Sequence, residues 1–316
     1  MQEPKYFKKR GIGAMLMLPL SLVWSGVDRL RRRFIRPYKS RIPVICVGNA
    51  VLGGVGKTPI VIEIARELMA SGLKVAILSR GYRGRVKGSK IVRLKDSAYM
   101  VGDEAKMMAD KLPDALVVVG ANRGASARLV ERKADVIIMD DGLQNYTLCK
   151  DFNICVFDAK AGVGNRLVFP AGPLRQSLGV VMSGIDAAVV MNGRAGSWLG
   201  DFKPVFEAKI EVVTNISSYR GRGVVAMAGI GRPGKFFEAL SAAGVKPKRL
   251  AAFPDHHDYV RKELVDLAKP GVPVLTTEKD YVKIPPDLRL AFVPVEIRAV
   301  LPAELVQKII CKISES

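Results

Sequence analysis

The chain has 316 residues, of which 49% are hydrophobic and 25% are charged; this balance excludes an intrinsically disordered chain, and the length suits one large domain or two ordinary ones. Its 50 Lys and Arg against 30 Asp and Glu give a net charge of +20. A surplus of this size indicates an anionic partner, which on charge alone could be nucleic acid, an anionic membrane surface or a phosphorylated substrate.

The first feature along the chain is an uncharged apolar run over residues 11–27, with basic residues before and after it. No small-x-small cleavage site of a signal peptide precedes the arginines that follow. The run is just short of the roughly 20 apolar residues of a spanning helix, and Pro19 interrupts it. We expect an interfacial or re-entrant helix, with Trp24 at the acyl boundary and arginines on lipid phosphates. A helix that spans once and a helix packed on the core remain alternatives.

Apolar strands and helices alternate from residue 41 onward. Continuous apolar strands joined by helices predict a parallel sheet with helices on both faces. Strands are expected over residues 42–48, 74–79, 115–120, 135–139, 153–157 and 187–191, and helices over residues 58–70, 103–111 and 125–133.

The alternation breaks near residues 195–220, where turn residues gather and the apolar positions become alternating. A second α/β pattern follows, with strands over residues 223–229, 272–276 and 291–297 and a helix over residues 234–243. The expected organisation has three parts: an N-terminal apolar helix with its basic flank (1–40), a P-loop core domain (41–205) and a smaller α/β domain (206–316).

A glycine-rich turn with the sequence VGNAVLGGVGKTP joins the first strand of this pattern to its first helix. This is the context of a P-loop, in which backbone N–H groups and the helix N-terminus bind phosphate. Lys57 can reach the β- and γ-phosphates, and Thr58 can ligate Mg²⁺. Val51 stands where the strict motif has glycine. The residues expected to contact the nucleotide are Asn49, Gly53, Gly54, Val55, Gly56, Lys57 and Thr58, with Gln144 as a polar partner.

Two pairs of acids are candidates for metal binding or catalysis. Asp140 and Asp141 end the strand expected at residues 135–139. In a P-loop protein an acid at this place holds Mg²⁺ or its bound water, and the adjacent acid can orient a lysine. Asp103 and Glu104 open an expected helix, where acids commonly do no more than stabilise the helix dipole.

The only two histidines, His256 and His257, lie together in a polar loop beside acids. Residue spacing alone leaves three alternatives open, which are a metal site, a base and an ordinary surface loop. Arginines in loops after apolar strands suit phosphate binding, because such sheets bind ligands at the carboxyl ends of their strands. These arginines are Arg80, Arg83, Arg123 and Arg175.

Several motifs occur in the order typical of one enzyme family. Besides the phosphate loop, they are SRGYRG (79–84), VGDEA (101–105), ANR (121–123), DDGLQ (140–144), NRLVFPAGPLRQ (165–176), FPDHHDY (253–259) and TTEKDYVK (276–283). This ordered set, from about residue 40 to residue 283, resembles the tetraacyldisaccharide 4′-kinases of lipid A assembly. The resemblance implies a two-domain α/β protein with a P-loop core.

The resemblance also implies a reaction and a place. ATP, with Mg²⁺, would phosphorylate the 4′-hydroxyl of a tetraacylated glucosamine disaccharide 1-phosphate at the cytoplasmic face of a bacterial inner membrane, next to an anionic membrane surface. The catalytic pair of the family corresponds to Asp103 and His256. The further catalytic residues implied are Lys57, Asp141, Arg123 and Arg175, the arginines facing phosphate, and the implied metal-binding residues are Thr58, Asp140 and Glu104.

The alternative function is a membrane-recruited regulatory P-loop ATPase or GTPase switch without a lipid acceptor. Partitioning ATPases usually carry a second lysine early in the loop, and residues 51–54 contain none. A GTPase needs [NT]KxD, and the lysine of TEKD (277–280) is one position late. No aromatic-basic module is evident, so no nucleic-acid partner is expected.

Overall fold

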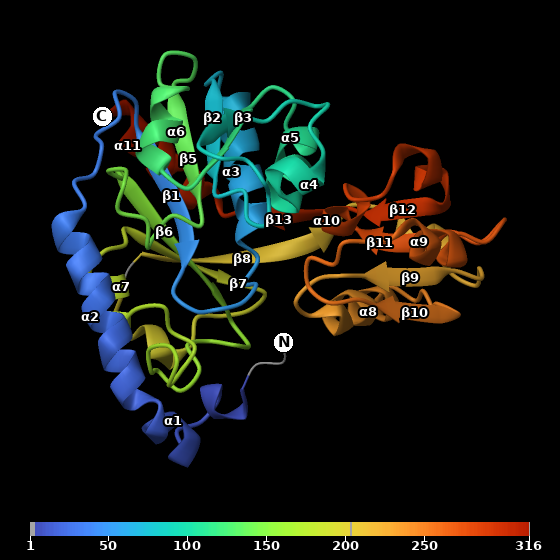
Figure 1. Cartoon of the computed structure of the whole chain (residues 1–316), viewed down its shortest axis with the longest axis horizontal. Helices are drawn as coiled ribbons and strands as arrows, with labels where there is room; N and C mark the ends of the chain where they lie inside the picture. The colour runs from blue at the N-terminus through green and yellow to red at the C-terminus, as the bar shows by residue number, and fades with distance from the viewer. Residues whose placement is uncertain (1–3, 203, 316) are drawn as a thin grey trace.

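The computed structural model describes residues 4–202 and 204–315. The predicted segments also include residues 1–3, 203 and 316, which lie outside the described residues. Within the described residues the chain forms two sheets, one of nine strands and one of four. Each sheet carries its own helices, and the two units lie beside each other along the long axis of the molecule (Figure 1).

The larger sheet has the strand order β13-β8-β7-β6-β1-β5-β2-β4-β3. The edge strands β3 and β13 are antiparallel to their neighbours, and the strands between them are parallel. Its strands are β1 (Val44–Asn49), β2 (Val75–Ser79), β3 (Ser89–Ile91), β4 (Leu116–Gly120), β5 (Val136–Asp140), β6 (Phe152–Asp158), β7 (Ala187–Met191), β8 (Val205–Val212) and β13 (Ile297–Val300).

Both faces of the larger sheet are buried, which explains why its strands are continuous apolar runs. In β1, Ile45 and Val47 pack into the core on the side of α3 and α11, whereas Val44 and Cys46 pack into the core on the side of α6. This alternation follows from the twofold repeat of a strand. The helices of this unit are α3 (Lys57–Ala70), α4 (Ala98–Val101), α5 (Asp103–Lys111), α6 (Arg123–Arg128), α7 (Leu178–Met182) and α11 (Ala303–Ser314).

The smaller sheet repeats this design with the order β10-β9-β11-β12, all parallel. In β9, Ala226 packs with Leu240 of α8, whereas Val225 and Met227 pack with Leu264 of α9. The elements of this unit are β9 (Val225–Ala228), β10 (Arg249–Ala252), β11 (Val274–Thr277), β12 (Phe292–Val295), α8 (Pro233–Ala242), α9 (Arg261–Leu267) and α10 (Glu278–Tyr281). The predicted fold class, a parallel P-loop-type core with a smaller α/β unit, is confirmed. Short 3₁₀ helices lie at Lys5–Phe7, Ser197–Leu199, Ile216–Tyr219 and Pro286–Ala291.

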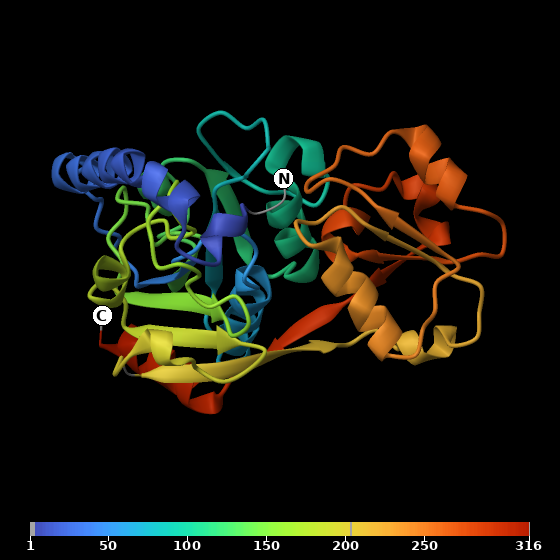
Figure 2. The same ribbon diagram turned by 90° about the horizontal axis from the view of Figure 1, so that it is seen from below.

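The sheets correct the predicted boundary between the two units. Residues 206–316 were expected to form the smaller domain, but β8 pairs with β7 of the larger sheet, and β13 returns to pair with β8 before α11 packs against α3. The alternating pattern of β8 reflects a strand that is half exposed, and it does not mark a new domain. Two adjacent strands therefore connect the units (Figure 2), where the N–H of Val213 donates to the carbonyl of Glu296 at 2.9 Å.

The N-terminal apolar run forms two helices, α1 (Ile12–Leu16) and α2 (Leu18–Phe34). Pro19 lies in the first turn of α2, where its missing N–H costs no intrahelical hydrogen bond. α2 continues through the arginine cluster and lies along the side of the larger unit (Figure 1). Among the described helices, none combines the length and the apolar character needed to cross a membrane.

Candidate active site

The phosphate loop lies between β1 and α3, at the carboxyl end of a central strand. Gly53 and Gly56 have φ values of 104° and 88°, a region that glycine adopts without strain. Val51, at the position of the first glycine in the strict motif, is buried and forms an isolated bridge with Leu174. This loop is therefore tied to the segment that carries Arg175.

Lys57 is held by side chains at the carboxyl ends of two neighbouring strands, Asn49 at the end of β1 and Asp141 directly after β5. Its Nζ donates to Asn49 Oδ1 at 3.2 Å and lies 3.5 Å from Asp141 Oδ1. Arg175 donates to the same Asp141 oxygen at 2.8 Å, and to Gln144 Oε1 at 3.3 Å. Five of the predicted side chains thus form one connected cluster, in which Gln144 also donates to the carbonyl of Asn49 at 3.2 Å; they are Asn49, Lys57, Asp141, Gln144 and Arg175.

The two acids after β5 have opposite electrostatic environments. Burial, together with the charges of Glu104 and Asp141, raises the pKa of Asp140. Burial would also raise the pKa of Asp141, but the charges of Lys57 and Arg175 outweigh it and lower that pKa. Asp140 is 3% exposed, and its Oδ1 has no hydrogen-bond partner among the described residues. A buried and crowded carboxylate oxygen of this kind favours a cation beside it.

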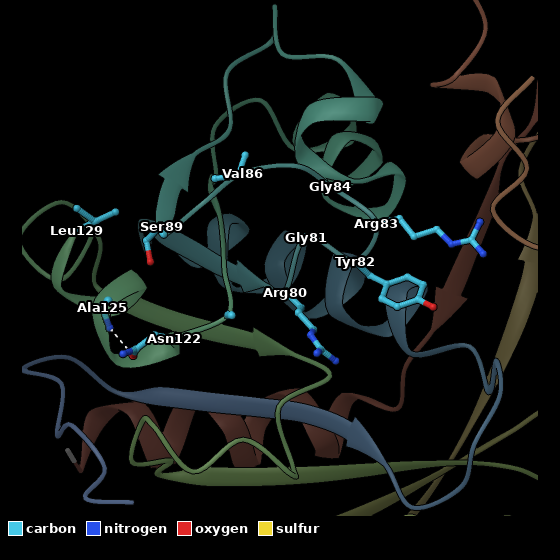
Figure 3. Close-up of a pocket in the computed structure, with 12 residues that line it drawn as sticks. Arg80, Gly81, Tyr82, Arg83, Gly84, Val86, Ser89, Asn122, Ala125 and Leu129 are labelled. Carbon is cyan, nitrogen blue, oxygen red and sulfur yellow. Dashed lines mark hydrogen bonds between the residues drawn. The ribbon is translucent and has the colours of Figure 1, made fainter.

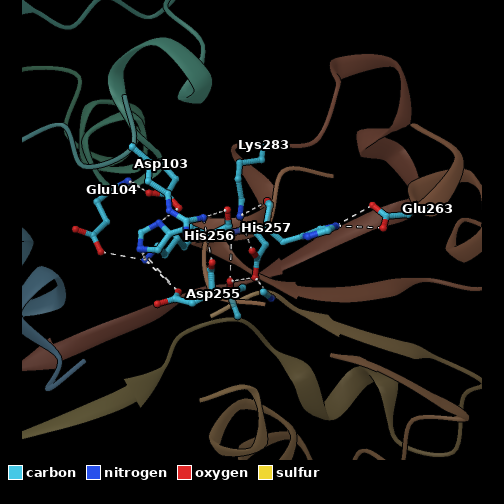
Figure 4. Close-up of polar contacts among 12 residues, drawn as sticks. Asp103, Glu104, Asp255, His256, His257, Glu263 and Lys283 are labelled. Carbon is cyan, nitrogen blue, oxygen red and sulfur yellow. Dashed lines mark hydrogen bonds and ion pairs between the residues drawn. The ribbon is translucent and has the colours of Figure 1, made fainter. Parts of the chain in front are cut away.

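Asp103, the first residue of α5, contacts the smaller unit through His256. His256 Nδ1 lies 2.8 Å from Asp103 Oδ2, although 153 residues separate the two in the chain (Figure 4). Arg83 of the larger unit donates to the backbone carbonyls of Asp255 and His256, at 3.2 and 2.8 Å. The ring of Tyr82 packs edge-on against the His256 ring with centroids 5.0 Å apart.

Asp103 and Lys279 of α10 together determine which nitrogen of His256 carries the proton. Its Nζ lies 3.1 Å from His256 Nε2 and donates to Glu104 Oε1 at 3.1 Å. An ammonium group has no acceptor, so Nε2 must accept, and Nδ1–H then donates to Asp103. Burial opposes the charge of Lys279, but Glu104, Asp103 and Asp255 raise its pKa, so the ammonium stays charged.

This arrangement keeps Asp103 ionised. Burial alone would raise the pKa of Asp103, yet the hydrogen bond from His256 and the charges of Lys279 and Lys283 hold it below its ordinary value. Its other oxygen, Oδ1, accepts the N–H of Glu104 at 2.9 Å. The result is a buried carboxylate with an oriented imidazole at the junction of the two units.

His257, the second histidine, points away from this pair (Figure 4). Its Nε2 contacts the carboxylate of Glu263 at 2.9 and 3.2 Å, in the first turn of α9. The two histidines therefore have different environments, because only His256 faces Asp103. Within the described part of the chain, no group of three or more His, Cys, Asp or Glu side chains is arranged to hold a metal ion.

Arg123 does not lie where the sequence predicted. It is 2% exposed, and its guanidinium donates to the backbone carbonyls of Gly120 and of Asp140, the latter at 3.3 Å. Burial lowers its pKa to about 10. Arg123 therefore binds the backbone at the ends of β4 and β5. The prediction of a phosphate-facing side chain was wrong because a loop position in the sequence does not reveal whether the side chain is buried.

A cavity of about 710 Å³ opens beside this junction. Figure 3 shows Arg80, Tyr82 and Arg83 following one another along the loop after β2, with Asn122 and Leu129 on the other side. Arg80 forms no hydrogen bond or ion pair with any residue that the structure describes. Sequence reasoning assigned no role to Tyr82 or Lys279, although both lie inside motifs that it singled out.

A P-loop lysine, acids on the adjacent strand and an aspartate–histidine pair at the sheet edge define a phosphotransferase of the P-loop class. The sequence model of the tetraacyldisaccharide-1-P 4′-kinase family matches residues 13–314. The chain belongs to this family, as the motifs predicted.

Individual relatives agree with this assignment. The tetraacyldisaccharide 4′-kinase of Methylobacterium nodulans is 42% identical over 298 residues, which cover 90% of this chain and 87% of the relative. That of Rhodopseudomonas palustris is 39% identical over 301 residues, which cover 91% and 88%. The solved structure of LpxK from Aquifex aeolicus in complex with ATP superposes with a TM-score of 0.79 at 30% identity, over 95% of this chain and 99% of that one.

Proposed function

We propose that this chain transfers the γ-phosphate of ATP to the 4′-hydroxyl of a tetraacyldisaccharide 1-phosphate, at the cytoplasmic face of a bacterial inner membrane. The observation that carries the proposal is the 2.8 Å contact between Asp103 and His256. It joins the two units at the sheet edge that holds the P-loop. A regulatory switch that only hydrolyses nucleotide has no need of a base shared between two units.

The nucleotide side follows the logic of phosphoryl transfer, in which positioning and charge neutralisation dominate. Lys57 and the N–H groups of the loop would hold the β- and γ-phosphates, with Asp141 orienting Lys57 at 3.5 Å. Arg175, fixed by Asp141 and Gln144, would face the phosphates from the other side. A cation fits beside the unpartnered Oδ1 of Asp140.

Mg²⁺ bound with ATP would be held by Thr58, Asp140 and Glu104, and it would supply further neutralisation of phosphate charge. Glu104 follows Asp103 directly in the chain and pairs with Lys279 at 3.1 Å, which supports a metal site next to the proposed base. Burial and the charges of Glu104 and Asp141 raise the pKa of Asp140, and a divalent cation would offset both effects, because opposite charge favours the ionised carboxylate.

The acceptor side uses Asp103 as the base. Its carboxylate is ionised and buried, and His256 fixes its orientation through Oδ2. As the hydroxyl oxygen bonds to the γ-phosphorus, the bond from that phosphorus to the β,γ-bridging oxygen breaks, ADP leaves, and Asp103 takes the hydroxyl proton. A positioned base typically contributes about 10²- to 10⁴-fold. The cavity lined by Arg80 and Tyr82 would receive the sugar, and the unpaired guanidinium of Arg80 suits a substrate phosphate.

The N-terminal helices suit a membrane-bound acceptor. In α2 the side chains of Leu20, Val23, Val27, Leu30 and Phe34 recur every three or four residues and are 52–74% exposed. An exposed apolar stripe on a helix with a basic end is typical of an interfacial helix on anionic lipid. It would bring the site to the bilayer surface, where a tetraacylated substrate lies.

The test is transfer of label from [γ-³²P]ATP to the purified disaccharide precursor in mixed micelles, with the lipid products separated by chromatography. The proposal expects label in the lipid with the wild-type chain. It expects at least a hundredfold less with Asp103→Ala, while ATP still binds. Release of inorganic phosphate without labelled lipid would instead support the regulatory switch.

A further inference from the structure

The face of α2 that packs on the protein is polar, and it is not the face that carries the exposed apolar stripe. Ser21, Trp24 and Asp28 follow one another at spacings of three and four, which places them on one side of the helix. Asp28 is the only acid among the residues of α2, and arginines occupy most of the positions that follow it in the helix. These three side chains all contact the segment of residues 168–176.

Trp24 and Ser21 bind the backbone of this segment. Trp24 Nε1 donates to the carbonyl of Arg175 at 3.1 Å, and its ring packs edge-on against Phe169 with centroids 5.3 Å apart. Ser21 Oγ donates to the carbonyl of Val168 at 2.8 Å and accepts the N–H of Ala171 at 3.0 Å. α2 therefore fixes the main chain of this segment at Val168, Ala171 and Arg175.

Asp28 binds the residue that follows Arg175. Gln176 Nε2 donates to Asp28 Oδ2 at 2.7 Å and to the Tyr146 hydroxyl at 2.7 Å, and that hydroxyl donates to Asp28 Oδ1 at 2.8 Å. Burial, followed by the hydrogen bond to Asp28, raises the pKa of Tyr146, so the hydroxyl keeps its proton. Each donor in this triangle has an acceptor, so the three side chains form a closed network.

The same segment is bonded to the phosphate loop on its other side. The N–H of Arg175 donates to the carbonyl of Ala50, and the N–H of Leu52 donates to the carbonyl of Pro173, both at 2.8 Å. The Arg175 guanidinium then reaches Asp141, which lies beside Lys57. A continuous path of hydrogen bonds therefore runs from α2 to the side chains proposed to hold the phosphates.

We propose that Trp24 and Asp28 are positioning residues for Arg175, so that the helix which meets the membrane also sets the geometry of the phosphate site. This inference rests on the proposed role of Arg175. The two faces of α2 then have separable functions, because the outward stripe binds lipid while the inward residues hold the segment of Arg175.

The test compares inward and outward substitutions in the full-length enzyme. Trp24→Phe removes the N–H donor and keeps the ring, and Asp28→Ala opens the triangle. Each is expected to lower kcat by about tenfold, the effect of one net hydrogen bond lost in the transition state, with sedimentation on anionic vesicles unchanged. Val27→Ser on the outward face is expected to weaken sedimentation, and Leu290→Ser, at a side chain of the smaller unit that is 99% exposed, is the control that should leave kcat unchanged.

A double-mutant cycle separates positioning from a general structural effect. In the Arg175→Ala background, Trp24→Phe should cause no further loss of kcat, because the side chain that Trp24 positions is already absent. Additive losses would overturn the inference, and so would wild-type kcat in both inward variants. If Arg175→Ala itself keeps wild-type kcat, the proposed role of Arg175 fails and this inference fails with it, whereas the kinase assay with Asp103→Ala still tests the function.

Discussion

Replacing Lys279 with methionine tests how the base is prepared. The change removes the ammonium 3.1 Å from His256 Nε2 and 3.1 Å from Glu104 Oε1, and keeps most of the apolar stem. His256 Nε2 then loses the donor that holds it, and the ring whose Nδ1–H donates to Asp103 is oriented less firmly. A hydrogen bond to a charged group contributes about 1.5–3 kcal/mol, so kcat should fall on the order of 10- to 100-fold.

The pH dependence should change in a defined direction. Lys279 is among the charges that hold the pKa of Asp103 below its ordinary value, so its removal raises that pKa. Because the base must be ionised, the acid limb of the kcat profile should move to higher pH. Lys279→Arg, which keeps a cationic donor, is the control and should leave the acid limb in place.

The assay is the rate of lipid phosphorylation between pH 5 and 9, and ¹⁵N NMR of the His256 ring at one pH gives the tautomer directly. The wild-type ring should be protonated at Nδ1 with Nε2 accepting from Lys279, and the methionine variant should lose the ¹⁵N shift that this hydrogen bond causes at Nε2. Wild-type kcat together with an unmoved acid limb in Lys279→Met would refute the role given to this lysine.

Three other predictions concern the base, the metal site and the membrane face. Asp103→Asn should lower kcat by about 10²- to 10⁴-fold with unchanged binding of a fluorescent ATP analogue, and loss of ATP binding would contradict a role confined to the base. Asp140 has a folded pKa raised from 3.8 to about 7, so its contribution to stability is present below its unfolded pKa and is lost as pH rises through the folded value. Between pH 4 and 7 and without metal, the melting temperature of Asp140→Asn should therefore fall less than that of the wild type, and the variant should lose kinase activity. If the two melting temperatures change with pH by the same amount, the pKa of Asp140 is not raised by folding. Leu20→Ser combined with Val27→Ser should reduce sedimentation on anionic vesicles by at least about tenfold, since each buried apolar side chain contributes about 1.5–3 kcal/mol, and unchanged sedimentation would remove the outward stripe from the membrane contact.

Much of the larger unit could be predicted from the sequence because its signals are local. The continuous apolar run before the GKT motif specifies a buried strand, and the predicted helix at residues 103–111 matches α5 (Asp103–Lys111). Lys57 and Asp141 were expected at the same edge of the sheet, because the carboxyl ends of parallel strands meet there. They lie 3.5 Å apart in the structure.

What the sequence could not supply depends on contacts between distant residues. An acid in the first turn of a helix usually does no more than stabilise the helix dipole. Only the contact with His256, which the sequence does not reveal, distinguishes Asp103 from such an acid. Lys279 acquires its role in the same way, because Glu104 lies 175 residues before it in the chain. Burial was equally hidden, so Arg123 was expected to face phosphate although its guanidinium bonds to backbone carbonyls.

The N-terminal helix shows a different limit. The run of apolar residues predicted contact with the membrane, but the run does not reveal which face of the helix meets the protein. In the structure Ser21, Trp24 and Asp28 face inward, and the apolar positions Leu22, Val23 and Val27 between them are exposed. The reason lies in the partner, since the segment of residues 168–176 offers backbone groups and Gln176 to the helix.

The central claim is that Asp103 and His256 act as one unit on the acceptor hydroxyl. The most direct measurement is kcat for lipid phosphorylation by Asp103→Ala, His256→Ala and the double variant. The double variant is expected to be no slower than Asp103→Ala, because His256 acts only through Asp103. Losses that multiply in the double variant would show that His256 and Asp103 act independently.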